Sequence, residues 1–144
     1  MKVSIELSQE YTPPHAVIYT DGVTEEIQRA VDLLNASDSP LIGRQGDRLV
    51  VIRPEEIYMI RVENGTTVIY TEKEAYESGR RLYELLGRLG NRFMQISRQV
   101  IINLAYVRSV EAGFGGTLVL KLKNGMKDYV SRTYLSSFKS YLGL

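Results

Sequence analysis

The stretch "NRFMQISRQVIINLAYV", residues 91–107, decides the fold, because it joins a polar triplet to an apolar run without glycine or proline. Residues 100–102 (Val-Ile-Ile) stand together, and Ile96 and Leu104 flank them. A short apolar run of this kind predicts a strand buried in the core. The polar triplet at residues 97–99 (Ser-Arg-Gln) then becomes a loop that the core holds in place, and its arginine needs a partner outside the core.

The composition is that of an ordinary soluble protein. A chain of 144 residues, 44% hydrophobic and 24% charged, favours one domain with an appendage. The sequence has no cysteine, which excludes disulfides, thiolate metal sites and cysteine nucleophiles. The first residues lack the apolar region of a signal peptide, and no apolar run approaches the roughly 20 residues of a membrane helix. We therefore expect a cytoplasmic protein.

The net charge of +1 conceals an uneven distribution along the chain. Residues 1–37 contain two basic and six acidic side chains, whereas residues 91–144 contain eight basic and two acidic ones. An asymmetry of this kind indicates a polyanionic partner for the C-terminal part, although a basic face can also be merely solvated.

The first 37 residues are predicted to form a small strand–strand–helix unit. Residues 2–7 (KVSIEL) alternate apolar and polar side chains, and residues 15–19 (HAVIY) form a second short strand. Thr24 can cap a helix, whose apolar positions follow the helical repeat: Ile27, Ala30, Val31 and Leu34. The unit is far too short for a phosphate-accepting receiver domain. We expect it to serve dimerisation or partner binding, and the sequence does not separate these two roles.

Residues 35–40 (NASDSP) are the predicted linker, and residues 38–144 the second domain. Two Asn-Gly pairs, at residues 64–65 and 124–125, predict tight hairpins. The predicted strands are residues 41–43, 48–52, 57–62, 68–70, 107–110, 117–122 and 127–130. Thr71 and Glu74 predict the capped start of an internal helix that runs to Leu89, and residues 133–142 predict a short C-terminal helix. The expected class is mainly β (α+β overall) with antiparallel sheets.

No catalytic constellation is visible. The single histidine, His15, lies in the acidic appendage, and no cluster of histidine, aspartate and glutamate has the spacing of metal ligands. The segment "GFGG", residues 113–116, precedes a strand where a phosphate cradle would need a helix, so we read it as a hairpin turn. We expect no enzyme, no metal, no cofactor and no small-molecule substrate.

Two segments nonetheless match a known pattern. "FMQISRQVIINLAYVRSVE" (residues 93–111) and "KNGMKDYVSRTYLSSFKSYL" (residues 123–142), with the strand and hairpin at residues 57–70 upstream, resemble the LytTR DNA-binding domain of bacterial transcription regulators. The resemblance covers roughly three quarters of the chain, from about Pro40 to Leu144.

The resemblance implies an elongated β-β-β arrangement of antiparallel sheets, with one internal and one C-terminal short helix. It implies double-stranded promoter DNA as the partner, read by loops that enter successive major grooves. Members usually act as dimers on imperfect direct repeats. Members of this length that carry no receiver domain resemble regulators that are inhibited by a small membrane-bound protein.

The resemblance also implies DNA-contacting residues in three loops. Thr66, with Asn64, stands in the first loop, Arg98 in the second, and Arg132 in the third. The two arginines suit bidentate hydrogen bonds to guanine or a pairing with phosphate. Phosphate or sugar contacts suit the remaining polar residues: Ser97, Gln99, Ser131 and Lys127. Asn103, by contrast, is expected to tie a turn or a strand end through its side chain.

The second loop departs from the family pattern. Gln95, Ser97 and Gln99 stand where the family often has arginine, histidine and serine. This makes the loop less basic, so that either the target sequence differs or binding is weaker. A different class of function therefore remains open, namely a protein-interaction module that keeps the fold and uses its basic face for an acidic protein. In that case Arg98 is an ordinary surface arginine at a strand end, and Arg132 a helix-entry arginine paired to an acid.

Overall fold

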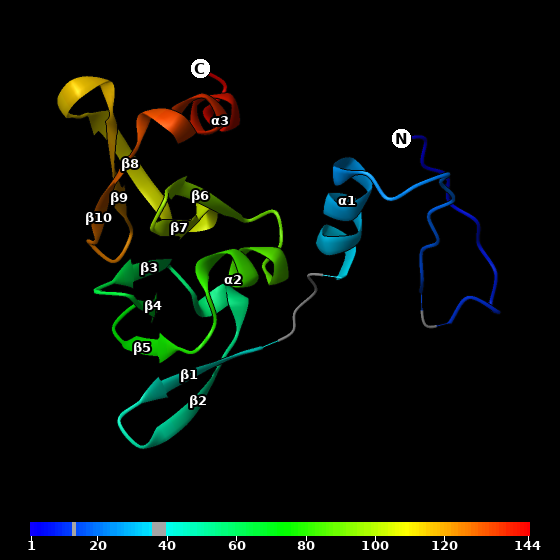
Figure 1. Cartoon of the computed structure of the whole chain (residues 1–144), viewed down its shortest axis with the longest axis horizontal. Helices are drawn as coiled ribbons and strands as arrows, with labels where there is room; N and C mark the ends of the chain where they lie inside the picture. Colours follow the sequence, from blue (N-terminus) through cyan, green and yellow to red (C-terminus); the bar gives the residue numbers. More distant parts are fainter. Residues whose placement is uncertain (13, 36–39) are drawn as a thin grey trace.

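The computed structural model describes residues 1–12, 14–35 and 40–144. Ten strands in this part of the chain form two antiparallel sheets (Figure 1). The strands are β1 Leu41–Gln45, β2 Arg48–Ile52, β3 Met59–Glu63, β4 Thr66–Tyr70, β5 Ala75–Ser78, β6 Phe93–Ser97, β7 Val100–Asn103, β8 Val107–Ala112, β9 Leu118–Leu122 and β10 Lys127–Val130. The helices are α1 Glu25–Asn35, α2 Leu82–Arg88 and α3 Arg132–Leu142, with single 3₁₀ turns at Pro54–Glu56, Leu104–Tyr106 and Phe114–Gly116.

The larger sheet has seven strands in the order β2-β1-β5-β4-β3-β7-β6, and the smaller sheet has the order β10-β9-β8. Both Asn-Gly pairs form hairpins as predicted, between β3 and β4 and between β9 and β10. The mainly β class with antiparallel sheets, one internal helix and one C-terminal helix is confirmed.

Strands β3 and β7 separate two hydrophobic cores. Ile60 and Ile101 are opposite each other in the pair and lie in one core, which Leu85 of α2 joins. Met59 and Ile102, the next opposite pair, lie in the other core, which Phe138 of α3 completes. Because successive side chains of a strand point to opposite faces, a stretch of strand that lies between two cores is apolar on both faces. This is why β7 shows no alternation.

Asn103, at the end of β7, is the buried polar residue that fixes the junction between strand and turn. Its amide nitrogen Nδ2 donates a hydrogen bond to the carbonyl of Ile57 at 2.9 Å, and its Oδ1 accepts one from the backbone N–H of Ala105 at 3.0 Å. The side chain is 1% exposed. It therefore ties the start of one strand to the end of another, as the sequence predicted.

A charged cluster joins the two sheets. The Arg61 guanidinium on β3 donates to Glu63 at 2.7 Å and reaches Asp128 of β10 at 3.3 Å. Tyr70 donates its hydroxyl hydrogen bond to Glu63. Burial disfavours the charge on Arg61, but its hydrogen bonds with Tyr70, Glu63 and Asp128 outweigh this and raise its pKa well above the usual value. The pKa of Glu63 is lowered, chiefly by the Tyr70 hydrogen bond and then by Arg61, against the opposing effect of burial.

The internal helix is shorter than the sequence predicts, because a strand occupies the first part of the expected segment. Thr71 accepts a hydrogen bond from the Glu74 N–H at 3.3 Å, but its own N–H donates back to the Glu74 carbonyl at 3.0 Å. The chain therefore turns back into β5, and the helix begins only at Leu82. The prediction of a helix from Thr71 was wrong. The acidic residues after Thr71 lie in this turn and on β5, not in a helix.

A glycine allows β1 to approach β5 closely. A Cβ atom at Gly43 would lie 2.6 Å from both the Ile52 and the Tyr76 side chains. Any other residue would separate the two strands at this point.

The N-terminal unit differs from the prediction. Residues 2–7 and 15–19 form no strand in the structure, so the strand–strand part was wrong. The helix is confirmed as α1, and Thr24 caps it by accepting a hydrogen bond from the N–H of Ile27 at 3.3 Å. Most of the predicted linker, residues 36–39, lies outside the described residues. Within the described ranges no helix has the length and apolar content that crossing a membrane requires.

Replacing the buried junction residue should destabilise the fold. Asn103→Ala leaves the Ile57 carbonyl and the Ala105 N–H unsatisfied, so we expect the free energy of unfolding to fall by about 2 kcal/mol in urea titrations. Asn103→Asp should cost at least as much, because a carboxylate oxygen would face the Ile57 carbonyl. Gln99→Ala, at an exposed turn, is the control and should change little. A stable Asn103→Asp variant would show that this amide does not hold the junction.

The Arg61 cluster predicts a pH-dependent contribution from Glu63. The pKa of Glu63 is lowered in the folded protein, so its stabilising effect is complete above the ordinary glutamate value of about 4.3 and is lost as the pH falls through the folded value. Glu63→Gln should therefore be about 1 kcal/mol less stable than wild type at pH 7. The difference in the free energy of unfolding between the two proteins should become smaller below about pH 4.

The measurement is the free energy of unfolding of both proteins between pH 7 and pH 3. Glu111→Gln, on the exposed side of β8, is the matched control and should follow the wild type at every pH. A gap that keeps its size at pH 3 would contradict the assigned role of Glu63.

Candidate nucleic-acid interface

The first predicted DNA-contacting loop is the β3–β4 hairpin. Asn64 and Gly65 both have positive φ angles, 50° and 77°, which is the geometry that an Asn-Gly hairpin prefers. Asn64 and Thr66 are exposed at the tip. The hairpin therefore presents an amide and a hydroxyl to the outside from a short, fixed turn.

The second loop is the two-residue turn between β6 and β7. Neither Arg98 nor Gln99 takes a positive φ angle, and β6 instead has a register shift between Gln95 and Ser97. Such a bulge bends a strand and changes where the adjacent side chains point. Arg98 is exposed, and among the hydrogen bonds and ion pairs between described residues its guanidinium takes part in none.

A backbone hydrogen bond joins the second loop to the first. The carbonyl of Gln99 accepts from the N–H of Val62 at 2.9 Å, two residues before Asn64. The Arg98 turn and the Asn64 hairpin are thus held side by side at the same end of β3. Their relative position depends on main-chain atoms and not on flexible side chains.

The third loop is the entry to α3. The N–H of Ser131 donates to the carbonyl of Ile96 at 2.9 Å, which fixes this entry to β6 just before the Arg98 turn. Arg132 is the first residue of α3, and its Nε donates to the carbonyl of Gly115 at 2.7 Å. A guanidinium has five N–H donors, so this bond leaves the outer edge of Arg132 able to bind a further acceptor.

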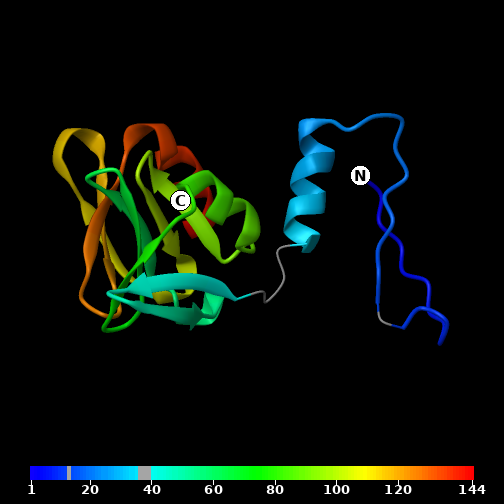
Figure 2. The ribbon, with the colours of Figure 1, turned by 60° about the horizontal axis from the view of Figure 1, so that its bottom comes forward.

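We call this surface the three-loop edge. It comprises the three loops at residues 64–66, 97–99 and 131–132, together with the β8–β9 turn at residues 113–116 that Arg132 contacts. Figure 2 shows the β8–β9 loop (gold) and the start of α3 (orange) together at one end of the domain, with β1 and β2 at the other. Arg98 and Arg132, both exposed, belong to this edge. The nearest carboxylate on β3, Glu63, is already bonded to Arg61 and Tyr70. The edge therefore offers positive charge to an anionic partner.

Two of the predicted site residues are not exposed on this edge. Ser97 is only 6% exposed, and its hydroxyl accepts from the N–H of Gln99 at 3.3 Å, so it shapes the turn. Lys127 is exposed but begins β10, five residues before Arg132, which corresponds to roughly 15 Å along an extended chain. Asn64, Thr66, Arg98, Gln99 and Arg132 are exposed on the edge, and Ser131 is half-buried beside them.

Sequence reasoning missed one residue of the edge. Phe114, at the tip of the β8–β9 loop, is 99% exposed. Thr117 donates its hydroxyl hydrogen bond to the Phe114 carbonyl at 2.6 Å, and Arg132 holds the adjacent Gly115. The flanking glycines identified the segment as a turn, but they gave no signal that its aromatic ring would lie next to a predicted base-contacting arginine.

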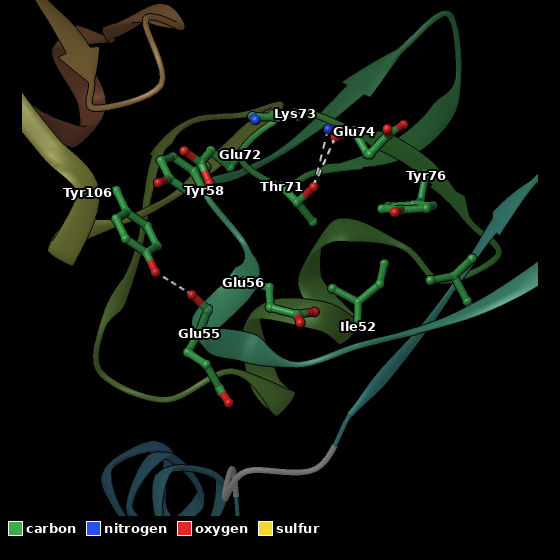
Figure 3. Close-up of a pocket in the computed structure, with 11 residues that line it drawn as sticks. Ile52, Glu55, Glu56, Tyr58, Thr71, Glu72, Lys73, Glu74, Tyr76 and Tyr106 are labelled. Atoms are coloured by element: carbon green, nitrogen blue, oxygen red, sulfur yellow. Dashed lines mark hydrogen bonds between the residues drawn. The ribbon is translucent and has the colours of Figure 1, made fainter.

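A pocket of about 430 Å³ lies at the opposite ends of β3 and β4 (Figure 3). The rings of Tyr58 and Tyr106 stack there with centroids 3.9 Å apart, and Tyr106 donates to the Glu55 carbonyl. Burial, then the negative charge of Glu72, and then Tyr106 raise the pKa of Tyr58. Four glutamates line the pocket with one lysine: Glu55, Glu56, Glu72, Glu74 and Lys73. This charge disfavours a phosphate, and no group of metal-ligating side chains occurs among the described residues.

Known proteins resemble this chain over its second domain and beyond. The sequence profile of the LytTr DNA-binding domain matches residues 47–143. The chain is 33% identical to the sensory transduction protein LytR of Staphylococcus haemolyticus over 144 residues, covering 99% of this chain and 56% of that protein. It is 32% identical to the sensory transduction protein LytT of Enterococcus faecalis over 129 residues, covering 86% of this chain and 53% of that protein.

The chain thus spans about half the length of these two relatives. It is also 25% identical to an uncharacterized HTH-type transcriptional regulator of Staphylococcus aureus, with 100% of this chain and 99% of that protein covered. A solved LytTr DNA-binding domain from Bacillus cereus has the same fold, with a TM-score of 0.70 and 20% identity, over 74% of this chain and 98% of that one.

The profile match covers well over half of the chain, and it includes β3 to α3 with every loop of the three-loop edge. The resemblance inferred from residues 93–111 and 123–142 is therefore confirmed. The chain belongs to the LytTR family and carries its DNA-binding domain.

Proposed function

We propose that the protein is a transcriptional regulator that binds promoter DNA sequence-specifically by inserting the three-loop edge into the major groove. The observation that carries this proposal is the fixing of Arg98 and Arg132 to the same strand. The Arg98 turn directly follows β6, and the Ser131 N–H before Arg132 bonds to the Ile96 carbonyl of β6. Two exposed guanidinium groups on one rigid support suit simultaneous contacts with base edges.

The two arginines have different roles in this proposal. Arg98 lies on a turn, and no described residue pairs with its guanidinium, so both of its donor edges can face a guanine or a phosphate. Arg132 uses Nε on Gly115 and keeps its outer N–H groups for the DNA. Its orientation is therefore fixed before binding, which reduces the entropy lost on recognition.

The neutral residues of the edge position the protein on the duplex. Asn64 and Thr66 on the first hairpin, and Gln99 and Ser131 beside the arginines, contact phosphate, sugar or base edges. Lys127 lies farther along β10 and contacts phosphate on the flank of the site. Ser97 acts indirectly by holding the turn that presents Arg98.

We further propose that the protein acts as a homodimer on direct repeats. A small membrane-bound inhibitor as regulatory partner stays a prediction, and so does the alternative of a protein-interaction module that uses the same basic edge for an acidic protein. The matched profile and the solved relative, both described as LytTr DNA-binding domains, and a relative named as a transcriptional regulator favour DNA over an acidic protein.

The two arginines are tested by substitution. Arg98→Ala and Arg132→Ala should each weaken binding to the preferred duplex by about 1–3 kcal/mol and relax discrimination at one base position. Arg48→Ala, an exposed arginine on the β1–β2 hairpin at the other end of the domain, is the matched control. Gel-shift titrations on preferred and scrambled duplexes at fixed salt give the affinities. If the wild type and both variants bind every duplex with equal affinity, the proposal is wrong.

Phe114 is proposed to make an apolar contact with DNA, either with a thymine methyl group or by entering a base step. Phe114→Ser should reduce affinity roughly tenfold, whereas Phe114→Leu should keep most of it, because leucine retains an apolar side chain. Tyr83→Ala removes a ring that is 71% exposed on α2 and serves as the control. If Phe114→Ser binds as tightly as wild type, the ring does not contact DNA.

A further inference from the structure

The residues before the linker carry apolar side chains that no other described residue of the chain covers. Val3, Ile5 and Leu7 alternate with polar residues along the sequence, and each is at least 80% exposed. Of the described residues that form the two cores, none precedes Leu41. Figure 1 shows this part of the chain as extended segments and α1, outside the two sheets.

We propose that residues 2–7 pair with the same residues of a second copy of this chain, as two antiparallel strands. A segment with β alternation and free backbone donors and acceptors is a ready site for strand addition. A second copy supplies the identical edge, and a two-fold axis makes each contact occur twice. The proposal rests on the homodimer of the proposed function and names its surface.

The charges along the segment select one register. With Ser4 opposite Ser4 of the second copy, Val3 faces Ile5 and Lys2 faces Glu6. Each lysine then lies opposite a glutamate, and apolar residues lie opposite apolar ones, which is the stabilising arrangement across an antiparallel pair. Shifting the register by one residue on each strand, to place Ile5 opposite Ile5, moves Lys2 away from Glu6. Among the described residues of its own chain, Glu6 meets only the Tyr11 hydroxyl, at 3.5 Å, the outer limit of a hydrogen bond.

The neighbouring helix can complete the paired strands. A two-stranded ribbon is marginal unless a helix covers it. Helix α1 supplies an apolar side for this purpose, with Ile27 and Val31 half-buried and Leu34 exposed.

A charge exchange tests the register with the full chain. Lys2→Glu and Glu6→Lys each place like charges opposite each other, so each should raise the dimer dissociation constant roughly ten- to thirtyfold in sedimentation velocity. Mixing the two variants should restore dimers as heterodimers, because every opposed pair is then attractive. Dimers that are insensitive to both changes, or a wild-type chain that is monomeric at every concentration, would overturn the proposal.

A second pair of variants separates dimerisation from folding and from DNA binding. Ile5→Asp should abolish dimers, whereas Val23→Asp, at a site that is 75% exposed and outside the pairing, should not. Both should unfold at the wild-type temperature, because neither side chain belongs to a core. On a duplex with a single site, Ile5→Asp should bind as wild type does. Unchanged DNA binding by Arg132→Ala would contradict the proposed function and leave the dimer proposal untouched. If Ile5→Asp remains dimeric, residues 2–7 are not the interface.

Discussion

The structure depends on the burial of one strand on both of its faces. β7 lies between two cores, and its Val-Ile-Ile run contributes Ile101 to one and Val100 and Ile102 to the other. Antiparallel pairing with β3 and β6 fixes its register, because a slip by one residue would exchange the side chains between the cores. Asn103 then ends the strand with two buried hydrogen bonds. This strand holds the two sheets and the helices α2 and α3 in their positions.

The candidate interface follows from that constraint. The turn before β7 must project from the end of the buried hairpin, and main-chain hydrogen bonds attach its neighbours to it. The carbonyl of Gln99 accepts a hydrogen bond from the N–H of Val62, and the carbonyl of Ile96 accepts one from the N–H of Ser131. Residues far apart in the chain are therefore set on one edge without contacts between their own side chains. A binding surface built in this way loses little conformational entropy when a ligand arrives.

Part of this could be predicted from the sequence. The uninterrupted run of β7, both Asn-Gly hairpins and the role of Asn103 follow from local chemistry. The strand β5 could not be predicted, because the Thr71–Glu74 signal for a helix cap is also satisfied by a tight turn, and pairing with β4 decides between them. The proximity of Arg132 and the Phe114 loop depends on a contact across 17 residues, which no local pattern reveals. The segment at residues 2–7 has the pattern of a strand but pairs with no strand in the part of the chain that the structure describes.

Selecting bound sequences from a pool of random duplexes, with the wild type and with the Arg98→Ala and Arg132→Ala variants side by side, tests the central claim most directly. We expect the wild type to select one preferred sequence. Each variant should lose preference at a single position, and the two positions should differ and lie in the same site, because both arginines are held on one edge. Recovery of no preferred sequence by the wild type, or of the unchanged sequence by both variants, would contradict it.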